Sequence, residues 1–206
     1  MPVLTDAHRV EAERIRSRYP QGRERSAIMP LLYLVQSVEG QVTSDGLREV
    51  ADLVGTTTAE VQAVASFYTM LRLRRTGEHL VAVCTNLSCA LRGANDLYAA
   101  AIEAIDADAT GTSPDGKITV VEEECLGACD AAPLVQVNVA NLDRVTRERL
   151  LGVLDGLRRD EVPAAARGAT PGDFRAASRI LAGLEGGAAT EPRTVTAPPR
   201  RPGGGH

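Results

Sequence analysis

The four cysteines of this chain are the residues whose type and spacing could do chemistry. They form two pairs, Cys84 with Cys89 and Cys125 with Cys129, and each pair lies next to an apolar stretch of strand length. Deprotonated thiols are ligands for zinc and for iron–sulfur clusters. The pairing therefore predicts a single site at which all four cysteines act as metal ligands.

The spacing alone leaves three uses of these thiols open. Structural zinc sites usually have cysteines separated by two to four residues, which both pairs fit loosely. A [2Fe–2S] cluster takes four thiolates from loops near the surface, with backbone donors close by. Redox-active thiols are the third use, although the Cys-x-x-Cys pattern of disulfide chemistry is absent. We favour the cluster over zinc, and zinc over redox thiols.

The predicted elements around the first pair favour negative charge. Cys84 follows the apolar run 79–83, and the carboxyl ends of strands are where open α/β sheets place their sites. Cys89 precedes an apolar helical stripe over 90–105, and the amino end of a helix stabilises anions. These positions predict lowered pKa values for the two thiols. In the second pair, Gly127 allows the short loop to fold back.

Three zones position these thiols. Residues 1–75 form a predicted helical segment whose apolar residues recur at helical spacing and whose ends carry capping residues. We interpret this segment as packing and docking surface. Phe67 and Tyr68 at its end are either core anchors or part of a docking face. The predicted helices cover about 6–18, 25–38, 43–54 and 57–68.

Residues 76–160 alternate between strand and helix patterns, which predicts a small α/β domain with a mixed sheet. His79, at the start of the first strand, is interpreted as a surface or edge residue. Pro133 precedes a strand, and we predict a cis peptide bond before it. The predicted order is strand 79–83, helix 90–105, strand 117–121, strand 134–139 and helix 145–157.

Residues 161–206 are rich in proline, glycine, alanine and arginine. Such a composition buries too little apolar surface to offset chain entropy, so we predict a largely disordered or partner-ordered tail. Only the stretch 173–184 could hold a helix.

Composition excludes several classes of function. The formal net charge of −4 gives no basic patch for nucleic acid. The longest apolar stretch, 27–35, has nine residues and contains a proline, whereas a membrane span needs roughly 20. No secretory signal is visible, so we expect a cytoplasmic protein without a direct membrane span. The reducing cytoplasm disfavours disulfides.

The residues around the cysteines resemble those of the thioredoxin-like [2Fe–2S] ferredoxin family over roughly 10–158. The resemblance rests on two loops and a turn: Cys84-Thr-Asn-Leu-Ser-Cys89 followed by Gly93, Asp115-Gly116, and Glu124-Cys125-Leu-Gly-Ala-Cys129 followed by Pro133. It implies a helical bundle segment followed by a thioredoxin-like mixed-sheet ferredoxin domain. It also implies one [2Fe–2S] cluster, held by Cys84, Cys89, Cys125 and Cys129.

The function implied by this resemblance is single-electron transfer within NADH:quinone oxidoreductase (respiratory complex I). The cluster would exchange electrons with the flavin (FMN) of a partner subunit that binds NADH. Because no glycine-rich dinucleotide loop follows a strand here, NADH and flavin are expected on that partner. The chain would then be a redox subunit without catalytic residues, on the cytoplasmic side of the membrane, bound to other subunits of the complex's peripheral arm.

Two alternatives accompany this interpretation. The same module would serve as the equivalent diaphorase subunit of an NAD-linked hydrogenase or formate dehydrogenase. In a different class, the four thiols would hold zinc in a structural interaction module. The acidic run 122–124 before Cys125 is open to two interpretations as well. Its carboxylates either lower the cluster potential or form a solvated strand end.

Overall fold

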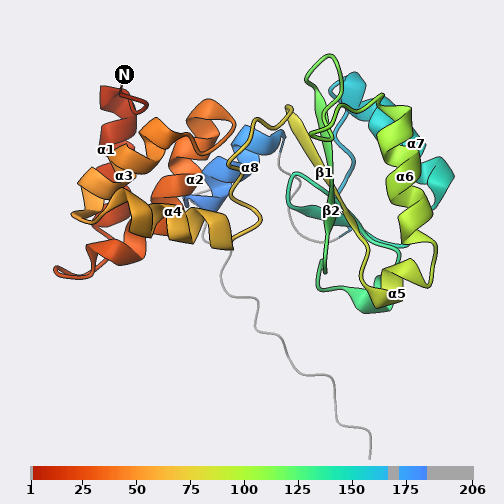
Figure 1. Ribbon diagram of the computed structural model, residues 1–206, viewed down its shortest axis with the longest axis horizontal. Coiled ribbons are helices and arrows are strands. Elements are labelled where there is room, and N and C mark those ends of the chain that lie inside the picture. The colour runs from red at the N-terminus through yellow and green to blue at the C-terminus, as the bar shows by residue number, and fades with distance from the viewer. Residues whose placement is uncertain (1, 167–171, 185–206) are drawn as a thin grey trace, which may run out of the picture.

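The computed structural model describes residues 2–166 and 172–184. Two lobes lie side by side: a group of N-terminal helices and a lobe built on a sheet (Figure 1). None of the helices in the described part of the chain has the length and apolarity that crossing a bilayer requires.

Threonine caps and glycine stops define the N-terminal helices. The side chains of Thr5, Thr43 and Thr57 each accept a hydrogen bond from a backbone N–H in the first turn. Gly40 and Gly55 end two helices in the left-handed conformation, with φ of 75° and 67°. The predicted helices are confirmed to within three residues. They are α1 (Asp6–Arg16), α2 (Ile28–Glu39), α3 (Ser44–Val54) and α4 (Thr58–Phe67), with a 3₁₀ turn, η1 (Glu24–Ala27), before α2.

Helix α2 is the centre of this lobe. Its apolar residues are not confined to one stripe, because α1, α3 and α4 contact it from several sides. Leu31, Leu32 and Val35 are fully buried. Gly46 of α3 lies so close to α2 that an added Cβ would be 2.4 Å from Cγ1 of Val35. Any larger residue at this crossing would force Val35 or the helices to shift.

The second lobe has a mixed sheet, as predicted, with four strands in the order β2-β1-β3-β4 where three were predicted. The central strand, β1, is parallel to β2 and antiparallel to β3. Alternate residues of β1, such as Val81 and Val83, face the helices α6 and α7, which cover one side of the sheet. The bounds are β1 (His79–Cys84), β2 (Ile118–Glu123), β3 (Val135–Val137), β4 (Ala140–Leu142), α6 (Ala94–Ala104) and α7 (Arg147–Arg158).

The structure differs from the predicted elements at two places. The helix predicted over 90–105 is broken, because Gly93 adopts a φ of 84° between a short helix, α5 (Leu87–Ala90), and α6. Strand β4 was not predicted. The turn before it places Asn138 and Val139 at positive φ, and valine rarely adopts this conformation.

The other face of the sheet is covered by a helix from the C-terminal region, α8 (Phe174–Leu181). It lies between the lobes, beside α2 (Figure 1). Phe174 lines the same apolar seam as Leu80 and Ala82 of β1. The predicted tail 161–206 thus contains the one helix that its sequence allowed, packed within the chain. Residues 167–171 and 185–206 lie outside the described part.

Gln36 connects α2, α8 and the segment after α4. This side chain is fully buried. Its Nε2 donates to the carbonyl of Met70 and to Oγ of Ser178, each at 3.1 Å. Its Oε1 accepts the backbone N–H of Arg72 at 2.7 Å. A fully hydrogen-bonded amide fixes the relative position of these three segments, because leaving any of its polar atoms unpaired would be costly.

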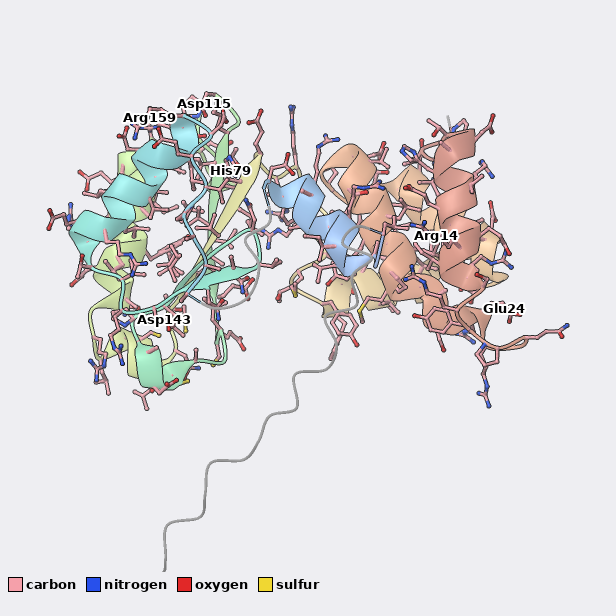
Figure 2. All side chains as sticks on the ribbon, turned by 180° about the vertical axis from the view of Figure 1, so that it is seen from behind. Arg14, Glu24, His79, Asp115, Asp143 and Arg159 are labelled. Atoms are coloured by element: carbon pink, nitrogen blue, oxygen red, sulfur yellow. The ribbon has the colours of Figure 1, made fainter. Side chains whose placement is uncertain are left out.

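His79 is buried, not an edge residue as predicted. Only 3% of it is exposed, at the start of β1 (Figure 2). Asn138 accepts the Leu80 N–H through Oδ1, so its Nδ2 is the donor to Nδ1 of His79, at 3.0 Å. The proton of the neutral imidazole is therefore on Nε2. Burial lowers the pKa of His79 and outweighs the opposing effect of the nearest carboxylates, of which Glu78 is the strongest.

We predict that replacing Phe174 with alanine destabilises the protein by about 3 kcal/mol, because it empties a buried aromatic site between the lobes. Ile180→Ala is the matched control on the same helix. Ile180 is 42% exposed, so this variant should lose less than about 1 kcal/mol. Chemical denaturation followed by circular dichroism measures both. Equal losses in the two variants would show that α8 is not held through Phe174.

We also predict that acidification destabilises the fold through His79. Its pKa is lower in the folded than in the unfolded state, so the unfolded chain binds more protons as the pH falls through 6.5. The free energy of unfolding should decrease there by up to about 1.4 kcal/mol per pH unit. His79→Gln removes the part of this pH dependence that comes from His79 and keeps the part that comes from the carboxylates. Denaturation curves between pH 7.5 and 5 measure the difference, and parallel curves would contradict the prediction.

Candidate metal centre

The first cysteine pair is buried at the end of the sheet. Cys84 is the last residue of β1, and its backbone N–H donates to the carbonyl of Leu134 at 3.1 Å. Cys89 lies within α5, and both side chains are 1% exposed. They pack with Leu134 and small residues of the second loop in one apolar cluster.

The second pair lies in an exposed loop beside the first. The Sγ atoms of Cys125 and Cys129 are 3.8 Å apart. Gly127 has a φ of 73°, which lets the loop fold back as predicted, and its backbone N–H donates to Sγ of Cys125 at 3.4 Å. The peptide bond between Ala132 and Pro133, just after this loop, is cis, which confirms the prediction.

Several hydrogen bonds join the two cysteine loops. Sγ of Cys84 is 3.7 Å from the carbonyl of Glu124, in donor geometry. Thr85, the next residue, donates its backbone N–H to the carbonyl of Glu123 at 3.0 Å and its hydroxyl to Glu122 at 2.6 Å. The parallel pairing of β1 with β2 ends at this point, with Cys84 opposite Glu123. The sheet therefore brings the two distant loops together.

The thiols form two pairs, not one compact tetrahedron. A single zinc ion with Zn–S bonds of about 2.3 Å would require all four sulfurs to lie about 3.8 Å apart. In the described part of the chain, no three cysteine sulfurs lie within 4.8 Å of one another. The group that does meet this distance is Glu78, His79 and Asp160. There the proton on Nε2 of His79 opposes metal binding, since a ligand nitrogen must be unprotonated.

The pKa values correct one prediction. The pKa of Cys89 is raised to about 11, first by burial and then by its hydrogen bond with Cys84. The neighbouring Cys125 raises the pKa of Cys129. The prediction that a helix end lowers the pKa of Cys89 is wrong, because Cys89 lies within a four-residue helix and is enclosed by apolar atoms. The thiols also influence one another across the pairs, so the two pairs lie within electrostatic reach of each other.

Apolar side chains are exposed near the site. Phe67 is 77% exposed and stacks edge-on against Tyr68, so the interpretation of this pair as core anchors is wrong. Leu87 and Leu91, on either side of Cys89 in the sequence, are also exposed. Exposed apolar residues of this size around one site are typical of an interaction surface.

A thioredoxin-like sheet with two loops that gather four thiols defines a ferredoxin-type metal-binding domain. Comparison with known families agrees: the model of the thioredoxin-like [2Fe–2S] ferredoxin family matches residues 12–158. The chain belongs to this family.

Named relatives are subunits of one type of complex. The chain is 47% identical over 175 residues to an NADH-quinone oxidoreductase subunit of Mycobacterium bovis, covering 85% of this chain and 69% of the relative. It is 43% identical over 143 residues to NADH-quinone oxidoreductase subunit 2 of Thermus thermophilus, covering 69% of this chain and 79% of the relative.

A solved structure shares the fold. A chain of an NAD⁺-reducing [NiFe]-hydrogenase in its H₂-reduced state superposes with a TM-score of 0.57 at 18% sequence identity. The match covers 66% of this chain and 22% of the hydrogenase chain. About two thirds of this chain therefore corresponds in fold to about a fifth of that longer chain.

We predict that iodoacetamide alkylates Cys125 and Cys129 of the metal-free chain before it alkylates Cys84 and Cys89. The first two thiols are exposed, whereas Cys89 is buried and its pKa of about 11 leaves roughly one part in a thousand as thiolate at pH 8. Iodoacetamide labelling followed by peptide mass spectrometry measures the order. Equal rates at all four positions would contradict the structure of the site.

Proposed function

We propose that this chain is the electron-transfer subunit of an NADH:quinone oxidoreductase (its 24-kDa subunit), with one [2Fe–2S] cluster held by Cys84, Cys89, Cys125 and Cys129. The observation that carries the proposal is the meeting of two thiol pairs at the end of β1 in a chain of this family. Four thiolates are the usual ligand set of such a cluster. When bound, the cluster accepts and returns one electron at a time.

In this proposal the gathered thiols hold an electron and do no bond chemistry. Cys84 and Cys89 enclose one half of the site in apolar packing, while Cys125 and Cys129 face the surface. The N–H of Gly127 points at a ligand sulfur, and such a hydrogen bond stabilises added negative charge. Substrate oxidation is therefore assigned to a partner, which would carry FMN and bind NADH.

The exposed apolar residues beside the site support such a partner. Phe67, Leu87 and Leu91 would dock against the flavin-carrying subunit, with further subunits of the peripheral arm beyond it. The complex would place this chain on the cytoplasmic side of the membrane as a peripheral subunit.

Relatives favour this assignment over the related hydrogenase. The named quinone oxidoreductase subunits are 43–47% identical to this chain, whereas the hydrogenase likeness is one of fold. The subunits that co-purify with the tagged chain from its own cells test this choice. A quinone-reducing assembly supports the proposal, and a hydrogenase or formate dehydrogenase large subunit would overturn that part of it.

We predict that the anaerobically purified chain binds two irons and two sulfides and has visible absorbance that dithionite bleaches. Cys84→Ser and Cys125→Ser, one from each pair, should each lose most of the iron. Ser88→Ala, in the same loop, is the matched control and should keep it. Metal analysis and absorbance spectra measure these outcomes. A colourless chain with stoichiometric zinc would overturn the proposed function and leave a structural zinc module.

A further inference from the structure

A cleft of about 760 Å³ opens beside the candidate centre, between the two lobes. Cys125 and the acidic residues Glu122, Glu123 and Glu124 line one wall. The other wall comes from the segment that follows α4 and includes Arg72 and Arg74. Positive charge from the helical lobe therefore faces the loop that carries two of the four thiols.

The position of Arg72 is fixed by the fold. Its backbone N–H donates to the buried amide of Gln36 at 2.7 Å, and its carbonyl accepts the N–H of Val42 at 2.7 Å. Its Nη1 donates to the carbonyl of Thr69 at 3.4 Å. A backbone held on both sides restricts where the guanidinium can reach, in contrast to a mobile surface arginine.

Arg72 is a partly buried cation without a close carboxylate. It takes part in none of the ion pairs found among the described residues. Burial lowers its pKa, and the charge of Glu123 opposes that effect, which places the two groups within electrostatic reach. Removing a cation from water without an ion pair is unfavourable, unless other negative charge lies nearby.

A reduced cluster would supply the negative charge near Arg72. With four thiolates, an oxidised two-iron centre has a formal charge of −2, and one electron from the reductant makes it −3. The carboxylates before Cys125 oppose this step, because like charges repel. A cation on the facing wall favours it, because its attraction grows with the charge of the centre.

We propose that Arg72 is a charge-compensating residue that raises the reduction potential of the cluster held by Cys84, Cys89, Cys125 and Cys129. The inference rests on the proposed function. The helical lobe would then contribute to electron transfer as well as to packing. Because Gln36 also binds Ser178 of α8, the position of the compensating charge depends on the C-terminal helix.

The test is a redox titration of the full-length, cluster-loaded chain, followed by electron paramagnetic resonance. Arg72→Gln should shift the midpoint potential to a more negative value. The expected change is on the order of tenfold in the ratio of reduced to oxidised cluster, which for one electron is about 59 mV. Arg72→Lys keeps the charge and should stay near the wild-type potential. Arg72→Met keeps an apolar stem and makes the same test if the glutamine variant does not load.

Arg75→Gln is the matched control. This variant removes the same charge three residues away, but Arg75 lines a different cavity, with Thr76 and Asp115. The midpoint potential of the cluster in this variant should therefore remain that of the wild type. Equal shifts in the Arg72→Gln and Arg75→Gln variants, or none, would overturn the inference while the loaded cluster upholds the proposed function. A chain that binds no iron overturns both.

Discussion

Four thiols must be held together although their thiolate forms repel one another, and the rest of the structure depends on this constraint. Burial and the neighbouring Cys84 raise the pKa of Cys89, and Cys125 raises that of Cys129, so the gathered thiols resist ionisation. The fold supplies the force that keeps them close. The end of β1 is fixed by the backbone hydrogen bond from the N–H of Cys84 to the carbonyl of Leu134 and by parallel pairing with β2. A metal centre with several positive charges relieves the repulsion, which couples metal binding to the stability of this edge of the sheet.

The sheet can hold this edge only if both of its faces are covered. Helices α6 and α7 bury one face, and the other would expose Leu80 and Ala82 without the C-terminal helix α8. The same helix contacts α2 and hydrogen-bonds Gln36 through Ser178. A segment beyond the family match at 12–158 therefore connects the helical lobe to the sheet. It also contacts Gln36, which binds the backbone of Arg72, so packing far from the thiols positions one of the charged residues that line the cleft.

Most helices and strands could be predicted from local signals in the sequence. Features that depend on contacts between distant segments were missed. Helix ends such as that at Gly55 are encoded by a capping residue and a glycine within one turn, so they can be recognised directly. The break at Gly93 was missed because the apolar pattern continues across it. Strand β4 was missed because its turn uses Val139 at positive φ. His79 contacts Asn138, 59 residues away, and Phe174 contacts Glu78 from the C-terminal region, and no local sequence pattern records such contacts.

The gathering of the four thiols could be predicted from the sequence, whereas their electrostatic environment could not. The sequence has four cysteines in two close pairs, so composition and spacing lead to this set as the predicted ligands. The unequal exposure of the four thiols does not follow from composition or spacing, because it depends on which loop the sheet buries. The buried pair, Cys84 and Cys89, excludes water from one half of the site, while Cys125 and Cys129 are exposed and Cys125 lines the cleft. A centre enclosed on one side and exposed on the other comes closest to a docked molecule on its exposed side. The proposed partner would therefore offer an electron its shortest route if it docked over the charged cleft that Cys125 lines.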